Sequence, residues 1–184
     1  MLGVMGAAPF PAPGSYLRGV VQMRKGEVVS KSCKSLTEMQ DFKDKVAVIT
    51  GGSSGVGRSL AIALGRLGAK IVVGDVDKTA MAQLQSDLTV ENIEALVEFC
   101  DVTSADSLNC LADKAVATFG SIQLVFANAG ISAGESGAMW EYSEKDWQWC
   151  LNVNLWGVIN SINAFMPRLV AANEEAHFVV TGSG

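Results

Sequence analysis

Short apolar segments alternate with helical patterns five times after residue 45, and this alternation limits the fold more than any other feature of the chain. The segments are rich in β-branched and other apolar residues, as is typical of strands covered on both faces. We expect strands at 46–50, 71–75, 95–100, 122–127 and 177–181, and helices at about 56–67, 78–88, 108–119 and 143–169. Such alternation indicates parallel strands joined by right-handed crossovers. The sequence therefore predicts an α/β fold with a doubly wound, Rossmann-like parallel sheet.

The composition fits a globular protein and excludes several classes of partner. Apolar residues make up 49% and charged residues 18% of the 184 residues, and the net charge is −5. No cluster of Lys and Arg alternates with aromatic residues, so nucleic acid is not expected as a partner. No apolar run approaches the roughly 18 residues of a membrane span. The four cysteines show no C-x-x-C spacing, so we expect reduced thiols, no metal site and a cytoplasmic location.

The N-terminal part differs from the rest of the chain. The first 26 residues carry no acidic side chain, are rich in Gly, Ala and Pro, and show no period of 2 or 3.6. We therefore expect a flexible extension at residues 1–43 and a folded domain at 44–184. Acid-poor segments also resemble organelle transit peptides, so targeting stays open as an alternative.

A glycine-rich turn, TGGSSGVGRSL (50–60), joins the first predicted strand to the first predicted helix. Glycine lets the backbone turn with positive φ and lets a ligand approach main-chain N–H groups closely. A helix N-terminus adds free N–H groups and a positive dipole end, so the two together form an anion site suited to pyrophosphate. The residues expected to bind a dinucleotide here are Thr50, Gly51, Ser53, Ser54, Gly55, Val56 and Gly57.

Asp75 ends the second predicted strand, 18 residues after Gly57. A carboxylate in this place accepts hydrogen bonds from both hydroxyls of an adenosine ribose and repels a 2′-phosphate. No Lys or Arg lies within 50–57, and Arg58 is on the helix, so we favour NAD over NADP as cofactor. The alternative is that Asp75 is only a solvated strand end.

Five motifs in order resemble the short-chain dehydrogenase/reductase family over roughly residues 44–184. They are T-G-x-x-x-G-x-G at 50–57, Asp101-Val102, Asn128-Ala129-Gly130, NVNLWGV at 152–158 and VVTGS at 179–183. The resemblance implies an oxidoreductase that moves a hydride between NAD and a small-molecule alcohol or carbonyl substrate. It also implies that Asp101 and Val102 contact adenine, that Asn128, Ala129 and Gly130 lie in the cofactor site, and that an intact protein pairs through its long helix as a homodimer or homotetramer.

The long helix carries a polar residue in an apolar stripe. At 100° per residue, Leu151, Leu155, Val158, Ile162 and Phe165 share one face, and Asn154 falls within it. Asn154 is then either a structural lock on nearby backbone or the holder of a functional water, and the resemblance implies a proton-relay water. We expect this helix to begin at a Ser143 cap, with Asp146 three residues on, and to kink or end at Pro167.

The resemblance implies that Ser183 hydrogen-bonds the substrate oxygen. His177 is expected at the surface, and the four tryptophans are expected to serve packing or interfaces. The family's Tyr-x-x-x-Lys proton donor is missing, since Val20 stands four residues after Tyr16 and Asp146 four residues after Tyr142.

We therefore expect a truncated, inactive form whose last sheet strands are missing, which would leave 177–181 as a bare apolar edge. One alternative is a catalytically dead nucleotide-binding module that acts as a sensor or partner subunit. Another, a nucleotide-sugar enzyme of the extended family, fits the glycine spacing poorly.

Overall fold

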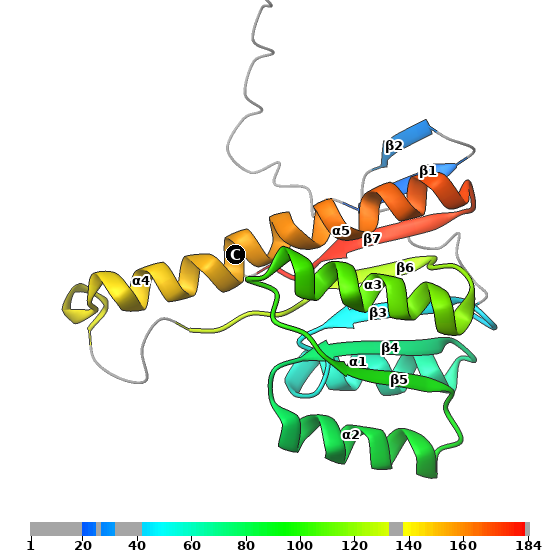
Figure 1. Ribbon diagram of the computed structural model, residues 1–184, viewed down its shortest axis with the longest axis horizontal. Helices are drawn as coiled ribbons and strands as arrows, with labels where there is room; N and C mark the ends of the chain where they lie inside the picture. Colours follow the sequence, from blue (N-terminus) through cyan, green and yellow to red (C-terminus); the bar gives the residue numbers. More distant parts are fainter. Residues whose placement is uncertain (1–19, 25–26, 32–41, 133–137, 183–184) are drawn as a thin grey trace, which may run out of the picture.

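A central sheet with helices on both faces organises the computed structural model, which describes residues 20–24, 27–31, 42–132 and 138–182 (Figure 1). The strand order is β2-β1-β7-β6-β3-β4-β5. The strands β3 to β7 are mutually parallel and confirm the predicted α/β sheet. Their bounds are Val46–Thr50 (β3), Lys70–Asp75 (β4), Ala95–Phe99 (β5), Leu124–Ala127 (β6) and Ala176–Val180 (β7).

Two apolar clusters lie on the two faces of this sheet. The helices are α1 (Gly55–Arg66), α2 (Lys78–Val90), α3 (Ala105–Phe119), α4 (Glu144–Leu151), a π-helical segment (Asn152–Trp156) and α5 (Gly157–Ala172), with a short 3-10 turn at Met139–Glu141. Helices α1 and α2 pack on Ile49 and Val73, and α3 and α5 pack on Val48 and Val125. Alternate residues of β3 thus face opposite clusters, which is why its sequence is apolar throughout. Among the described helices, none is both long and apolar enough to cross a bilayer.

Helix α1 packs on the sheet through small side chains as well as large ones. Val56 and Leu67 are 68% and 57% exposed, whereas Gly57, Ala61 and Leu64 are buried. The small residues Gly57 and Ala61 let the helix backbone approach the sheet closely, so they occupy the buried positions instead.

The long helix departs from its predicted face, although its start is confirmed. Ser143 caps α4 and pairs reciprocally with Asp146, as expected. Helix α5 runs through Pro167 to Ala172, close to the predicted end at 169, so the helix does not end at Pro167 and a kink there stays a prediction.

The apolar stripe itself is split between core and surface. Phe165 is buried, but Leu151, Leu155 and Ile162 are exposed. The π-helical turn at 152–156 has a wider repeat, so a 100° projection carried across it loses its phase.

The outer edge of β7 is covered, contrary to expectation. Strands β1 (Val20–Arg24) and β2 (Glu27–Lys31) form an antiparallel hairpin, and β1 pairs antiparallel with β7. Part of the predicted flexible extension therefore belongs to the sheet, and β7 is not a bare edge. His177, expected at the surface, is buried within β7 opposite β1.

Candidate functional site

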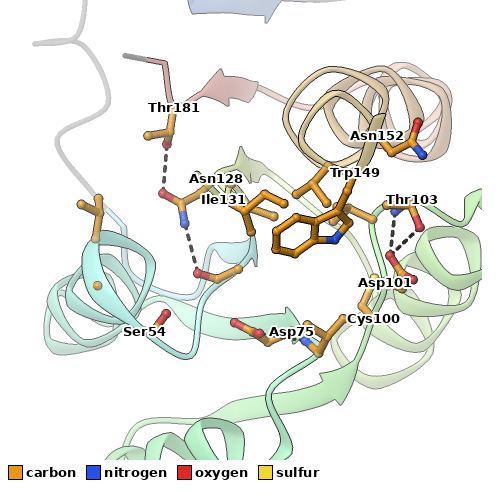
Figure 2. A pocket seen from close by; sticks show the side chains of 18 of the residues that line it. Ser54, Asp75, Cys100, Asp101, Thr103, Asn128, Ile131, Trp149, Asn152 and Thr181 are labelled. Carbon is orange, nitrogen blue, oxygen red and sulfur yellow. Dashed lines mark hydrogen bonds between the residues drawn. The ribbon is translucent and has the colours of Figure 1, made fainter. Parts of the chain in front are cut away.

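A pocket of about 850 Å³ opens where the parallel strands end (Figure 2). It brings together ten of the predicted cofactor residues from four separate strand ends: Gly51, Ser54, Gly55, Val56, Asp75, Asp101, Val102, Asn128, Ala129 and Gly130. Strands β3 and β6 are neighbours, and the helices that follow them, α1 and α5, pack on opposite faces of the sheet. Such a switch point is where open α/β sheets bind ligands.

The glycine-rich turn leaves space for a side chain at Gly55 but not at Gly57. Gly51 and Gly55 have φ of +62° and +50°, which favours glycine, and a Cβ on Gly55 would meet nothing within 4 Å. A Cβ on Gly57 would overlap the Gly51 carbonyl oxygen and lie 2.6 Å from Asn128 Nδ2. Gly55 therefore faces the pocket, whereas Gly57 allows helix, turn and strand to pack together.

Thr50 does not line the pocket but forms hydrogen bonds that support the glycine-rich turn. Its Oγ1 accepts hydrogen bonds from the backbone N–H groups of Asn128 (3.1 Å) and Ala129 (3.2 Å). The Asn128 carboxamide donates in return to the carbonyl oxygens of Thr50 and Gly51. These bonds tie the ends of β3 and β6 together and hold the turn in place.

Within the described part of the chain, no side chain caps the N-terminus of α1. Ser54 occupies its N-cap position, but its side chain makes no capping bond. The caps of α2, α3 and α4, which are Asp77, Ser104 and Ser143, all accept such bonds. Because Ser54 and Gly55 line the pocket, the free N–H groups and the positive end of the helix dipole favour an anion there.

Asp75 is more than a solvated strand end. Its Oδ2 accepts from the backbone N–H of Ser53 (3.0 Å), and its Oδ1 accepts from those of Val76 (2.7 Å) and Asp77 (3.1 Å). Burial raises the pKa of this carboxyl, but the hydrogen bonds from Ser53, Asp77 and Val76 outweigh burial and hold the pKa below its ordinary value. A fixed carboxylate acceptor therefore stands beside the glycine-rich turn. Ser53, predicted to contact cofactor, is buried behind it.

The end of β5 forms the far wall of the pocket. Asp101 Oδ1 accepts from the N–H (2.9 Å) and the Oγ1 (2.8 Å) of Thr103. Asn160 of α5 donates to the carbonyl oxygen of Val102 at 3.0 Å, which anchors this segment to the long helix. Cys100 is buried here, and desolvation raises the pKa of its thiol to about 11, so it stays protonated at neutral pH.

The short chain dehydrogenase family model matches residues 45–184. The chain belongs to the short-chain dehydrogenase family. It is 36% identical over 146 residues to a C alpha-dehydrogenase of a Sphingobium species, with 79% of this chain and 47% of the relative covered. It is 32% identical over 142 residues to 1-deoxy-11-beta-hydroxypentalenate dehydrogenase of Streptomyces exfoliatus, with 77% of this chain and 52% of that protein covered.

The fold also matches solved members of the family. A short chain dehydrogenase/reductase from Burkholderia phymatum, in complex with NAD, superposes with a TM-score of 0.75 at 41% identity, with 79% of this chain and 51% of that chain covered. This short-chain dehydrogenase chain spans about half the length of the curated relatives it matches.

Of the two predicted catalytic residues of this family member, the structure describes Asn154 but not Ser183. The Asn154 carboxamide clamps one residue, since its Nδ2 donates to the Ile131 carbonyl oxygen and its Oδ1 accepts from the Ile131 N–H, both at 2.8 Å. Asn154 is exposed and does not line the pocket, so its predicted place on a buried face is wrong. The observed contacts are those of a structural lock. Ser183 lies outside the described residues.

Trp149 and Thr181 are among the pocket residues that sequence reasoning missed. Trp149 lines the pocket from α4, although packing or an interface was expected for it. Thr181, after β7, donates to Asn128 Oδ1 at 3.1 Å and so joins the end of β7 to the glycine-rich turn (Figure 2). The position of Thr181 two residues before Ser183 was the available signal. No sequence pattern marks Trp149, because its helix covers the pocket only in the tertiary structure.

Proposed function

We propose that this chain is the dinucleotide-binding part of an oxidoreductase that transfers a hydride between NAD and an alcohol or carbonyl substrate. The observation that carries the proposal is the uncapped start of α1 beside an open glycine turn, with the Asp75 carboxylate next to it. The N–H groups of the turn would bind the pyrophosphate, and Asp75 would accept from the ribose hydroxyls. The Burkholderia phymatum relative, in complex with NAD, supports the same use of the shared fold.

The charges around Asp75 favour NAD over NADP. The negative carboxylate repels a 2′-phosphate, and Arg58 is engaged with Asp87 at 2.5 Å. Lys78 Nζ lies 5.8 Å from the centroid of the Phe99 ring and is the cation to test as an alternative phosphate partner. Bound NAD would supply the hydride acceptor, and the turn and Asp75 would orient it.

We expect binding without turnover from these 184 residues, because no tyrosine in them is followed by lysine four residues later. The alternative proposal is a module that binds nucleotide only, as a sensor or partner subunit.

Calorimetric titration tests the cofactor assignment. NADH should bind more tightly than NADPH, and Asp75→Ala should narrow that difference because it removes the repelling carboxylate. Asp106→Ala, which removes a carboxylate from the first turn of α3 outside the pocket, is the matched control and should leave the difference unchanged. Equal affinity of the unmutated chain for NADH and NADPH would contradict the assignment, as would tight NADPH binding that is lost in Lys78→Ala.

The long helix supports a proposed homodimer or homotetramer. Leu151, Leu155, Trp156 and Ile162 are exposed on one continuous helical segment, with Leu155 51% exposed. Apolar side chains gathered on one element mark surfaces that associate with a partner. The proposed partner is a second copy of this chain, as the family resemblance implies.

A further inference from the structure

Trp149 is an exposed aromatic residue at the edge of the proposed dinucleotide site. It comes from α4, where it is 54% exposed, and it lines the pocket together with Asn152 and Val153. Figure 2 shows its indole directed into the pocket, above Asp75 and Cys100, with the ring nitrogen on the side of Asp101 and Thr103. No hydrogen bond of this indole is recorded among the described residues, so contact with a ligand would displace no partner there.

The position of the indole identifies one end of the pocket. The glycine-rich turn and the uncapped start of α1 form the anion end, and Asp75 follows it as the ribose acceptor. The next groups beyond Asp75 are Phe99, Cys100 and the segment 101–103, which belong to the end of β5. A dinucleotide with its phosphates at the turn and a ribose at Asp75 would carry its adenine into this end.

Aromatic stacking is the chemistry available to Trp149 there. A half-exposed indole keeps a large apolar face in water, and a flat purine that covers this face removes both surfaces from water. When alanine replaces an aromatic side chain that stacks on a base, the affinity falls by about 1–3 kcal/mol, which corresponds to about 5- to 150-fold.

We propose that Trp149 is a binding residue of this site whose indole stacks on the adenine ring of the dinucleotide. The inference rests on the proposed function, because it needs a dinucleotide in the pocket. It assigns to α4 a role in holding the base, in addition to the contacts from the strand ends.

The test is calorimetric titration of the 184-residue chain with ADP-ribose, which contains the adenine, ribose and pyrophosphate but lacks nicotinamide. Trp149→Ala should weaken ADP-ribose binding about 5- to 150-fold, and Trp149→Phe should retain most of the affinity because a stacking ring remains. Trp140→Ala is the control, since Trp140 is 85% exposed and lies outside the pocket. It should bind ADP-ribose like the unmutated chain.

Tryptophan fluorescence gives a second readout. ADP-ribose should quench the emission of the unmutated chain and of Trp140→Ala, and this quenching should be lost in Trp149→Phe. Urea denaturation checks that each variant is folded, which is expected because the side chain is half-exposed.

Two results would overturn the inference in distinguishable ways. If Trp149→Ala binds ADP-ribose as tightly as the unmutated chain or more tightly, the stacking role is wrong and the proposed function stands. If the unmutated chain binds neither ADP-ribose nor NADH, the proposed function and this inference both fall.

Discussion

Replacing Gly57 by alanine tests the packing of the glycine-rich turn most directly. The added Cβ would overlap the Gly51 carbonyl oxygen and lie 2.6 Å from Asn128 Nδ2 and 2.9 Å from Gly52 Cα. Two of these neighbours are backbone atoms, which cannot rotate away as a side-chain end can. The start of α1 must therefore move away from the turn, or the Asn128 carboxamide must give up its bonds to Thr50 and Gly51.

The magnitude follows from those two costs. Overpacking of this kind costs about 1–3 kcal/mol. Loss of one of the two Asn128 hydrogen bonds adds about 1 kcal/mol. We expect Gly57→Ala to lower the free energy of unfolding by about 2–4 kcal/mol, a large share of the roughly 5–15 kcal/mol that holds a typical domain folded.

Urea denaturation followed by circular dichroism measures this loss, and Gly55 provides the matched control. An alanine at Gly55 meets open space but must adopt a φ of +50°, which costs about 1–2 kcal/mol. Gly55→Asn should cost less than Gly55→Ala, because asparagine tolerates the left-handed region. A Gly57→Ala variant within about 1 kcal/mol of the unmutated protein would refute the contact argument.

Two further predictions concern the core and the surface. In the folded chain the pKa of Cys100 is raised by burial to about 11, above the roughly 8.5–9 of an unfolded thiol. The stability it contributes is complete below pH 9 and should fall by about 2–3 kcal/mol as pH rises through 11. Urea unfolding at pH 8 and pH 11 measures this decrease in the free energy of unfolding. The decrease should be smaller in Cys100→Ala than in the unmutated chain, and unchanged in a variant of the exposed Cys110. Equal decreases in the two variants would contradict the prediction. Leu155→Lys should convert a dimeric chain to monomers in light scattering after gel filtration, and a monomeric unmutated chain would contradict the proposed pairing.

Much of the architecture could be predicted from the sequence because its signals are local. A strand covered on both faces is apolar along most of its length, so the apolar runs in VAVIT and IVVGD are sufficient to predict two strands. The glycine turn and Asp75 stand at strand ends, and parallel strands bring such ends to one edge, which is why the pocket contains ten of the predicted residues. The capping pair Ser143–Asp146 is likewise local, since its two side chains lie within one helical turn.

The errors arise where a local pattern depends on distant contacts. Helix periodicity identifies large apolar residues but not the closeness of packing, so it does not show that Gly57 is buried against the turn while Val56 is exposed. A π-helical turn is not visible in composition, so the face of Asn154 was wrong.

Sequence alone determined that this chain has alternating β and α elements, a glycine-rich turn before α1 and a carboxylate at the end of β4. The tertiary structure decided what those elements meet. It brought the β1–β2 hairpin onto β7 and the indole of Trp149 over the end of β5. The physical reason is that these contacts join segments far apart in the sequence. Strands β1 and β7 are more than a hundred residues apart, and α3 and β6 separate the end of β5 from Trp149. The residues next to each segment carry no information about such distant partners.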